Sequence, residues 1–278
     1  NFVAIAIFEL KVAATVGKGI VDPSVVDQYV VFGALIGAIV WNLITWYYGL
    51  PSSSSHALIG GLIGATVAKS GTAPLIGAGI GKTALFIVLS PLIGMLLGAL
   101  LMVAVSWICF RSTPRSVDRW FRRQLVSSAL YSIGHGSNDA QKTMGIIWLL
   151  LISAGVTTAD HIPAWVVISC YVALAGGTLF GGWRIIKTMG QRITKLRPVG
   201  GFAAETGGAI ALFTASGLGV PVSTTHTITG AILGVGAANR PSSVRWGVFA
   251  DILLAWLLTI PCSAFMAALA WWAGRQLF

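Results

Sequence analysis

Long apolar stretches make up most of the chain, and short polar segments separate them. A helix needs about 20 apolar residues to cross the hydrocarbon core of a bilayer, which is about 30 Å thick. The predicted spans are 29–50, 83–110, 125–155, 163–182, 201–220 and 247–273, with a weaker candidate at 2–16. Two shorter apolar segments, 52–68 and 222–238, each begin directly after a proline.

Composition agrees with this pattern and excludes a soluble domain. Hydrophobic residues form 56% of the chain, charged residues only 9%, and the mean hydropathy is +0.84. Soluble globular domains carry about 25% charged residues. We therefore predict an all-α polytopic membrane protein. The three cysteines stand singly in apolar stretches, and without paired spacing they predict neither disulfides nor a metal site.

The net charge of +10 could indicate a polyanionic partner, but the placement of the basic residues indicates a membrane orientation instead. Tracing the spans through a membrane puts the loops 111–123 and 184–197, with five basic residues each, on one side together with Arg240 and Arg245. Cytoplasmic loops carry such an excess of Lys and Arg. We therefore expect loop 111–123 to be cytoplasmic, with lipid headgroups as possible contacts, and expect no nucleic acid.

One six-residue phrase occurs twice, 170 positions apart. Pro51–His56 reads PSSSSH and Pro221–His226 reads PVSTTH. The register also pairs glycines and prolines outside the phrase: Gly37 with Gly207, Gly49 with Gly219, Gly60 with Gly230, Gly64 with Gly234, and Pro91 with Pro261. A match over this length predicts an internal repeat. We expect a first repeat at 1–110, a basic linker at 111–124 and a second repeat at 125–278.

Each copy of the phrase combines a proline with a run of hydroxyl residues at membrane depth. Pro51 and Pro221 favour the end of one helix, and a Ser or Thr just after them favours the start of the next. A helix N-terminus flanked by hydroxyl groups is suited to an oxyanion. Broken helices at matching positions of a repeat are typical of the substrate site of a secondary transporter. The alternative is that these hydroxyl groups only hydrogen-bond between helices.

A second cluster of polar residues interrupts the apolar span 125–155. His135, Asn138, Asp139 and Lys142 are spaced to share one face of a continuous helix. Ionisable residues within a span usually face a cavity, a partner or an ion. Asp139 is therefore a candidate to bind a cation or a proton, and a purely structural Asp139–Lys142 ion pair is the alternative. Glu205 is a further intramembrane acid, found in one repeat only, which either couples transport to an ion or lies solvated near the cytoplasmic end.

At these residues the chain resembles the inorganic phosphate transporter (PiT) family. That family has an inverted repeat and the signatures Gly-Ala-Asn-Asp-x-x-Asn and Pro-x-Ser-Thr-Thr-His. Gly136–Asp139 and Pro221–His226 resemble these signatures in the second repeat, and Pro51–His56 resembles the second of them in the first repeat. The first-repeat Asn-Asp signature would lie about 35 residues before Asn1, so we expect the chain to lack one or two N-terminal helices. Lys142 replaces the Asn of sodium-coupled animal members, as in the bacterial branch.

The resemblance implies an integral protein of the bacterial inner membrane with an inverted repeat and re-entrant hairpins. It implies symport of inorganic phosphate with Na⁺ or H⁺ and no other cofactor. The substrate-binding residues implied are Ser53, Ser54, Ser55, Asn138, Ser223, Thr224 and Thr225. Ion coupling is expected from Asp139, Asn138 and Glu205, with supporting roles for His56, His226, His135, Gln141 and Lys142.

Other functions stay open on the sequence. A sulfate permease would use the same oxyanion site. An intramembrane hydrolase would use Ser55 or Thr225 with a histidine and Asp139, although catalysis has no need of a duplicated phrase, and we expect no enzyme. The glycine-rich spans permit close packing within one subunit or in a homo-oligomer.

Overall fold

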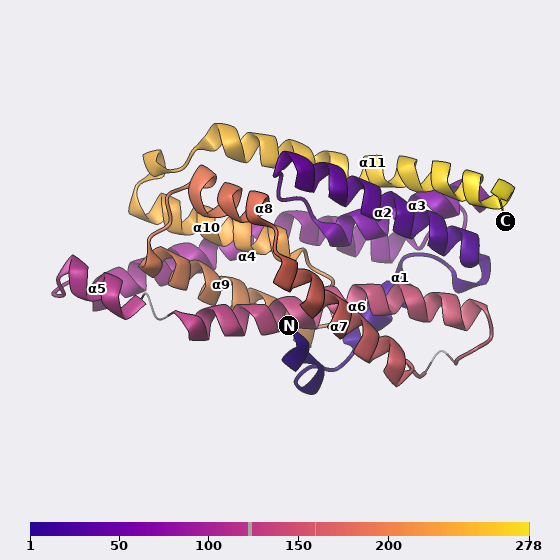
Figure 1. Cartoon of the computed structure of the whole chain (residues 1–278), viewed down its shortest axis with the longest axis horizontal. Coiled ribbons are helices and arrows are strands. Elements are labelled where there is room, and N and C mark those ends of the chain that lie inside the picture. The colour runs from indigo at the N-terminus through magenta and orange to yellow at the C-terminus, as the bar shows by residue number, and fades with distance from the viewer. Residues whose placement is uncertain (122–123, 159, 278) are drawn as a thin grey trace.

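The computed structural model describes residues 1–121, 124–158 and 160–277, and helices dominate this part of the chain (Figure 1). The helices are α1 (Lys11–Gly19), α2 (Gln28–Tyr48), α3 (Ser54–Ser70), α4 (Gly77–Ile108), α5 (Pro114–Phe121), α6 (Leu125–Ser153), α7 (Ala164–Phe180), α8 (Trp183–Lys187), α9 (Pro198–Gly217), α10 (Thr224–Asn239) and α11 (Trp246–Leu277). Four short helical segments join them: η1 (Phe2–Ala6), η2 (Pro23–Val25), η3 (Thr188–Ile193) and η4 (Pro241–Ser243). The all-α prediction is confirmed. The predicted linker holds α5, and its Arg122 and Arg123 lie outside the described residues.

The long helices and the two helical hairpins lie roughly along the long axis of the molecule, whereas α7 and α8 cross it obliquely (Figure 1). The long helices α4, α6 and α11 run along most of its length. The α2–α3 hairpin enters from the end where the C-terminus lies and turns back near the middle. The α9–α10 hairpin enters from the opposite end, where α5 lies, and also turns back near the middle. The bends of the two hairpins therefore approach each other at the centre of the molecule.

Three of the described helices, α2, α4 and α11, are long and apolar enough to cross a membrane. The bent pair formed by α7 and the segment Trp183–Ile193 is a fourth candidate, with a bend of 63°. The predicted spans 125–155 and 201–220 are helices α6 and α9, but the polar residues that they carry keep them outside this group. The weaker prediction at 2–16 was wrong, because η1 ends at Ala6 and α1 begins only at Lys11.

The two hairpins bend through the same backbone geometry. Gly49 and Gly219 both have positive φ, +67° and +65°, which glycine adopts without steric cost. The next residue in each bend, Leu50 or Val220, donates its N–H to a carbonyl five residues earlier, at 2.9 Å in both cases. This is the hydrogen bond of a Schellman helix end. The prolines were predicted to end these helices, and in the structure they follow two residues after the glycine that does so.

Each short helix packs on a long helix from the other half of the sequence. The glycine face of α3 lies on α11, where Gly60 meets Ile260 and Gly64 meets Ala264. The glycine face of α10 lies on α4, where Gly230 meets the backbone of Pro91. A glycine has no Cβ, so the two backbones approach closely, as at small-residue contacts between membrane helices. The paired glycines of the sequence thus make corresponding contacts.

Candidate functional site

The carboxylate of Asp139 is the centre of a polar cluster in the middle of α6. Its Oδ1 accepts from Lys142 Nζ at 2.7 Å and lies 3.5 Å from the hydroxyl of Ser55. Its Oδ2 accepts from Thr224 at 2.7 Å and lies 3.1 Å from His135 Nε2. The side chain is only 10% exposed. Continuity of α6 places His135, Asp139 and Lys142 together, as their spacing predicted. Asn138, predicted on the same face, instead contacts Ser216 and Val220.

Asp139 also joins the two copies of the repeated phrase. Ser55 is in the first turn of α3, and Thr224 is the first residue of α10. Because both hydroxyl groups contact one carboxylate of α6, segments 170 positions apart meet at one buried acid. The contact therefore brings hydroxyl groups of both repeats to one carboxylate.

The remaining hydroxyl groups of the two phrases have different surroundings. Ser53 and Ser223 are each 1% exposed and accept the N–H of His56 and His226, so they cap α3 and α10. Ser54 is exposed at the start of α3 and Thr225 is half-buried. Capping therefore orients the helix starts, and the hydroxyl residues that line cavities are Ser52, Ser54, Ser55, Thr224 and Thr225.

Two cavities flank Asp139. One, of about 490 Å³, is lined by Thr224, Thr225, His135 and Glu205, among others. The other, of about 170 Å³, is lined by Ser54, Ser55, Asn42 and Lys142 together with Asp139 itself. The smaller cavity contains hydroxyl groups of the first phrase, and the larger contains those of the second phrase together with Ser52 of the first. The Asp139–Lys142 pair lies at the boundary between them.

The two phrase histidines lie against each other behind this site. The rings of His56 and His226 are 4.7 Å apart in an edge-to-face arrangement. His226 also stacks on Trp256 of α11 at 3.7 Å, and the Trp256 indole donates to the carbonyl of Pro51 at 2.8 Å. Both histidines are 2% exposed or less. They pack the helix starts together and do not line the two cavities.

Two of the predicted site residues hold neighbouring segments in place. Asn138 is fully buried and donates to Ser216 and to the carbonyl of Val220, both at 3.3 Å, which fixes the bend after α9. Gln141 accepts the N–H groups of Val12 and Ala13 at 3.0 and 3.3 Å. These N–H groups belong to the first turn of α1, which lacks a cap of its own. Gln141 therefore caps α1 from another helix.

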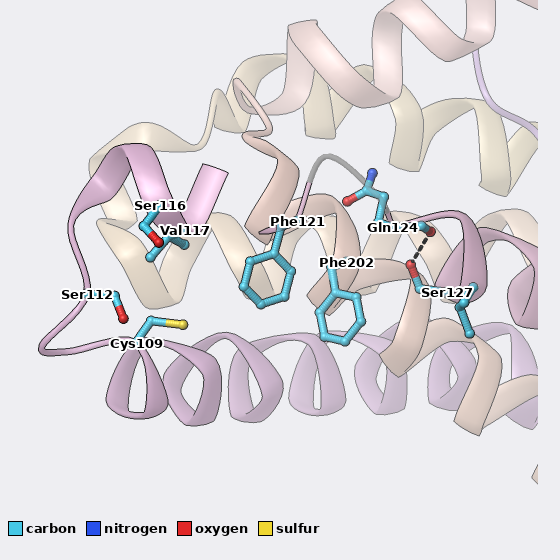
Figure 2. Close-up of a pocket in the computed structure, with 9 residues that line it drawn as sticks. Cys109, Ser112, Ser116, Val117, Phe121, Gln124, Ser127 and Phe202 are labelled. Carbon is cyan, nitrogen blue, oxygen red and sulfur yellow. Dashed lines mark hydrogen bonds between the residues drawn. The ribbon is translucent and has the colours of Figure 1, made fainter. Parts of the chain in front are cut away.

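Glu205 of α9 also lines the larger cavity. Its carboxylate accepts from Ser127 at 2.6 Å and from Ser128 at 2.9 Å. A separate pocket of about 360 Å³ lies beside Ser127, between α4, α5, α6 and α9. Figure 2 shows that Phe121, Phe202 and Cys109 supply much of its wall, and their rings and thiol make it largely apolar. This pocket contains none of the residues around Asp139.

Several residues of the site were not predicted from the sequence. Trp256 contacts both phrases, and Tyr131 donates to the carbonyl of Thr224 at 3.2 Å. Extending the repeat would have found Trp256, because Phe86 stands 170 positions earlier and packs against the apolar cluster that contains Val220 and Val222. The contacts of Ser127 and Ser128 with Glu205 could not be predicted from the sequence, since serines are common in membrane helices.

Comparison with known proteins identifies the relatives of this fold and site. The model of the phosphate transporter family matches residues 1–267. The chain belongs to the phosphate transporter family. A protein of Rhizobium meliloti named "Probable low-affinity inorganic phosphate transporter" is 58% identical over 99% of this chain and 83% of its own length. A protein of Bacillus subtilis with the same name is 46% identical over all of this chain and 84% of its own length.

A solved structure supports the same assignment at the level of the fold. "The sodium-dependent phosphate transporter" superposes with a TM-score of 0.89 at 26% sequence identity, covering all of this chain and 88% of the other. Membership of the phosphate transporter family makes the chain an integral membrane protein and not an enzyme. In the described structure, Ser55 bonds to Lys142 and Asp139, and not to a histidine as the hydrolase alternative requires.

Proposed function

We propose that this chain is a secondary symporter that moves inorganic phosphate with Na⁺ or H⁺. The observation that carries the proposal is the meeting of Ser55 and Thr224, one from each repeat, at the buried carboxylate of Asp139. The starts of α3 and α10 supply hydroxyl groups and helix N-termini, which favour an oxyanion. Ser54, Thr225 and the capped backbones complete the substrate site in this proposal, with Asn138 holding the bend that shapes it.

Coupling follows from the charge of the substrate. Moving a dianion inward against a negative interior costs about 2.3 kcal/mol per charge per 100 mV. Co-bound cations or protons offset this cost. Asp139 and Glu205 are the acids in reach of the cavities, and we assign them the coupling role.

The architecture supports a mechanism of alternating access. The α2–α3 and α9–α10 hairpins enter from opposite ends of the molecule, as re-entrant hairpins of an inverted repeat would (Figure 1). In this proposal the repeats 1–110 and 125–278 are related by a pseudo-twofold axis near Asp139. Movement of one helix group against the other would expose first one cavity and then the other.

In the same proposal, the distribution of basic residues determines the orientation of the protein in the membrane. The linker helix α5, η4 and the start of α11 share one end of the molecule (Figure 1), and this end carries Arg111, Arg240 and Arg245. We assign this end to the cytoplasm of a bacterial inner membrane. Exposed apolar side chains on α4 and α11, such as Leu96, Leu100, Leu257 and Leu269, would then contact lipid.

Purified protein in liposomes tests the function directly. We expect uptake of labelled phosphate that is driven by an imposed Na⁺ or H⁺ gradient and is little affected by excess sulfate. Sulfate uptake would replace the substrate and keep the oxyanion site. If neither anion moves under either gradient, the transporter proposal is wrong.

Glu205→Gln provides a test of the second acid. The substitution keeps the size of the side chain and removes the charge that Ser127 and Ser128 donate to. Hydrogen bonds to a charged group contribute about 1.5–3 kcal/mol, so uptake should fall about tenfold or more if transport depends on this carboxylate. Glu9→Gln is the control, because the carboxylate of Glu9 is exposed and pairs with the exposed Lys11. Equal uptake by the two variants would remove Glu205 from the mechanism.

A further inference from the structure

The ammonium group of Lys142 is buried among oxygen atoms from three different segments. It donates to Ser55 Oγ at 2.7 Å, to Asp139 Oδ1 at 2.7 Å and to the carbonyl of Val222. Its side chain is 2% exposed. An ammonium group has three N–H donors. Each donor therefore has a partner, and the group is fully coordinated without water.

These partners are the oxygen types that bind a small hard cation. Carboxylate, hydroxyl and backbone carbonyl oxygens are the usual ligands of such ions. The carbonyl of Val222 belongs to the unwound segment before α10, and unwound carbonyls coordinate ions in transporters with broken helices. The ammonium group of Lys142 therefore occupies a position with the chemistry of a cation site.

A second cation has no room on Asp139. Its Oδ1 faces Lys142, while its Oδ2 faces His135 and Thr224. Every direction in which the carboxylate usually accepts is used by a group of the chain itself. A Na⁺ ion at Oδ1 would also lie directly beside the fixed charge of Lys142, and like charges at this distance repel strongly inside a protein.

We propose that Lys142 is a tethered cation that takes the place of a transported Na⁺ between Ser55, Asp139 and Val222. This inference rests on the proposed phosphate transport and names the ion selectivity of that site. A tethered charge stabilises the bound anion and the contact between the two phrases. Unlike a transported ion, it does not cross the membrane. Phosphate uptake therefore needs no Na⁺ at this position. Asp139 then acts in coupling as the counter-charge of Lys142, and the cotransported cation or proton binds at Glu205.

Lys142→Asn tests the proposal in liposomes. The variant removes the fixed charge and leaves an amide oxygen near Ser55, Asp139 and Val222. Phosphate uptake by the unchanged protein should be the same in Na⁺ as in choline, at a constant pH gradient. Uptake by Lys142→Asn should become at least about fivefold greater in Na⁺, in the range of ordinary coupling between two ligands. Lys82→Asn, at the exposed start of α4, should behave as the unchanged protein does.

Two results would overturn the proposal: strong Na⁺ dependence in the unchanged protein, or no Na⁺ response in an active Lys142→Asn variant. If the variant is inactive, its melting temperature in detergent serves instead. Na⁺ binding should raise the melting temperature of Lys142→Asn by about 2 °C or more and leave that of the unchanged protein constant. Equal shifts would contradict the proposal. This measurement needs no phosphate transport, so it separates the role of Lys142 from the proposed function.

Discussion

Asp139→Asn should reduce phosphate uptake by about 100-fold or more and also destabilise the protein. The carboxylate is the counter-charge of the buried Lys142, and breaking a buried ion pair by removing one partner costs about 3–5 kcal/mol. Asn keeps the shape of the side chain but cannot balance the ammonium group. It would also weaken the contacts of Ser55 and Thr224, which hold the starts of α3 and α10 together.

Uptake per folded molecule and thermal melting, measured on the same preparations, check this expectation. Asp251→Asn is the matched control, because Asp251 is an exposed acid near the start of α11 and should tolerate the same change. Should Asp139→Asn transport phosphate at the rate and with the ion dependence of the unchanged protein, Asp139 has no part in coupling. A variant that melts earlier but transports normally would restrict Asp139 to stability.

Gly64→Ala should destabilise the protein although alanine is the better helix former. A Cβ at position 64 would overlap the carbonyl oxygen of Ala264 on α11, so the two backbones must separate. Overpacking of this kind costs about 1–3 kcal/mol, which exceeds the gain of up to about 1 kcal/mol from helix propensity. Gly230→Ala should act in the same direction, because its Cβ would overlap the carbonyl oxygen of Pro91 on α4.

Gly81→Ala is the control for both substitutions. Gly81 lies near the start of α4 with nothing within 4 Å of an added Cβ, so the same change should stabilise the helix slightly. Melting temperatures in detergent should therefore fall for Gly64→Ala and Gly230→Ala and stay constant or rise for Gly81→Ala. A rise in all three would mean that α3 and α10 do not pack closely on α11 and α4.

Much of the helical architecture could be predicted, because the signals are local. Apolar length located α2, α4 and α11, and the phrase after each proline located the starts of α3 and α10 within two residues. The failure at 2–16, by contrast, has a cause that is partly distant in the sequence. Apolar residues continue through η1, but the chain turns before Lys11, and α1 is capped by Gln141 from α6. A cap supplied by a distant helix leaves no pattern in the neighbouring sequence.

The candidate site was predictable only as far as residues share a helix or a repeat. Spacing brought His135, Asp139 and Lys142 together, and duplication indicated a meeting of the two phrases. Neither signal shows which hydroxyl group caps the helix and which one contacts Asp139. Ser53 and Ser55 are two positions apart in one run of serines, yet only the second contacts Asp139. That difference depends on how α3 and α6 approach each other.

Because α3 packs on α11 and α10 packs on α4, the two glycine contacts form at different times during synthesis. When α10 emerges from the ribosome, its partner α4 is already in the membrane. The partner of α3 is made much later, since Ala264 follows Gly64 by 200 positions. Synthesis at about 5–20 residues per second makes this interval about 10–40 s. The contact between the glycine face of α3 and α11 can therefore form only after α11 has been inserted.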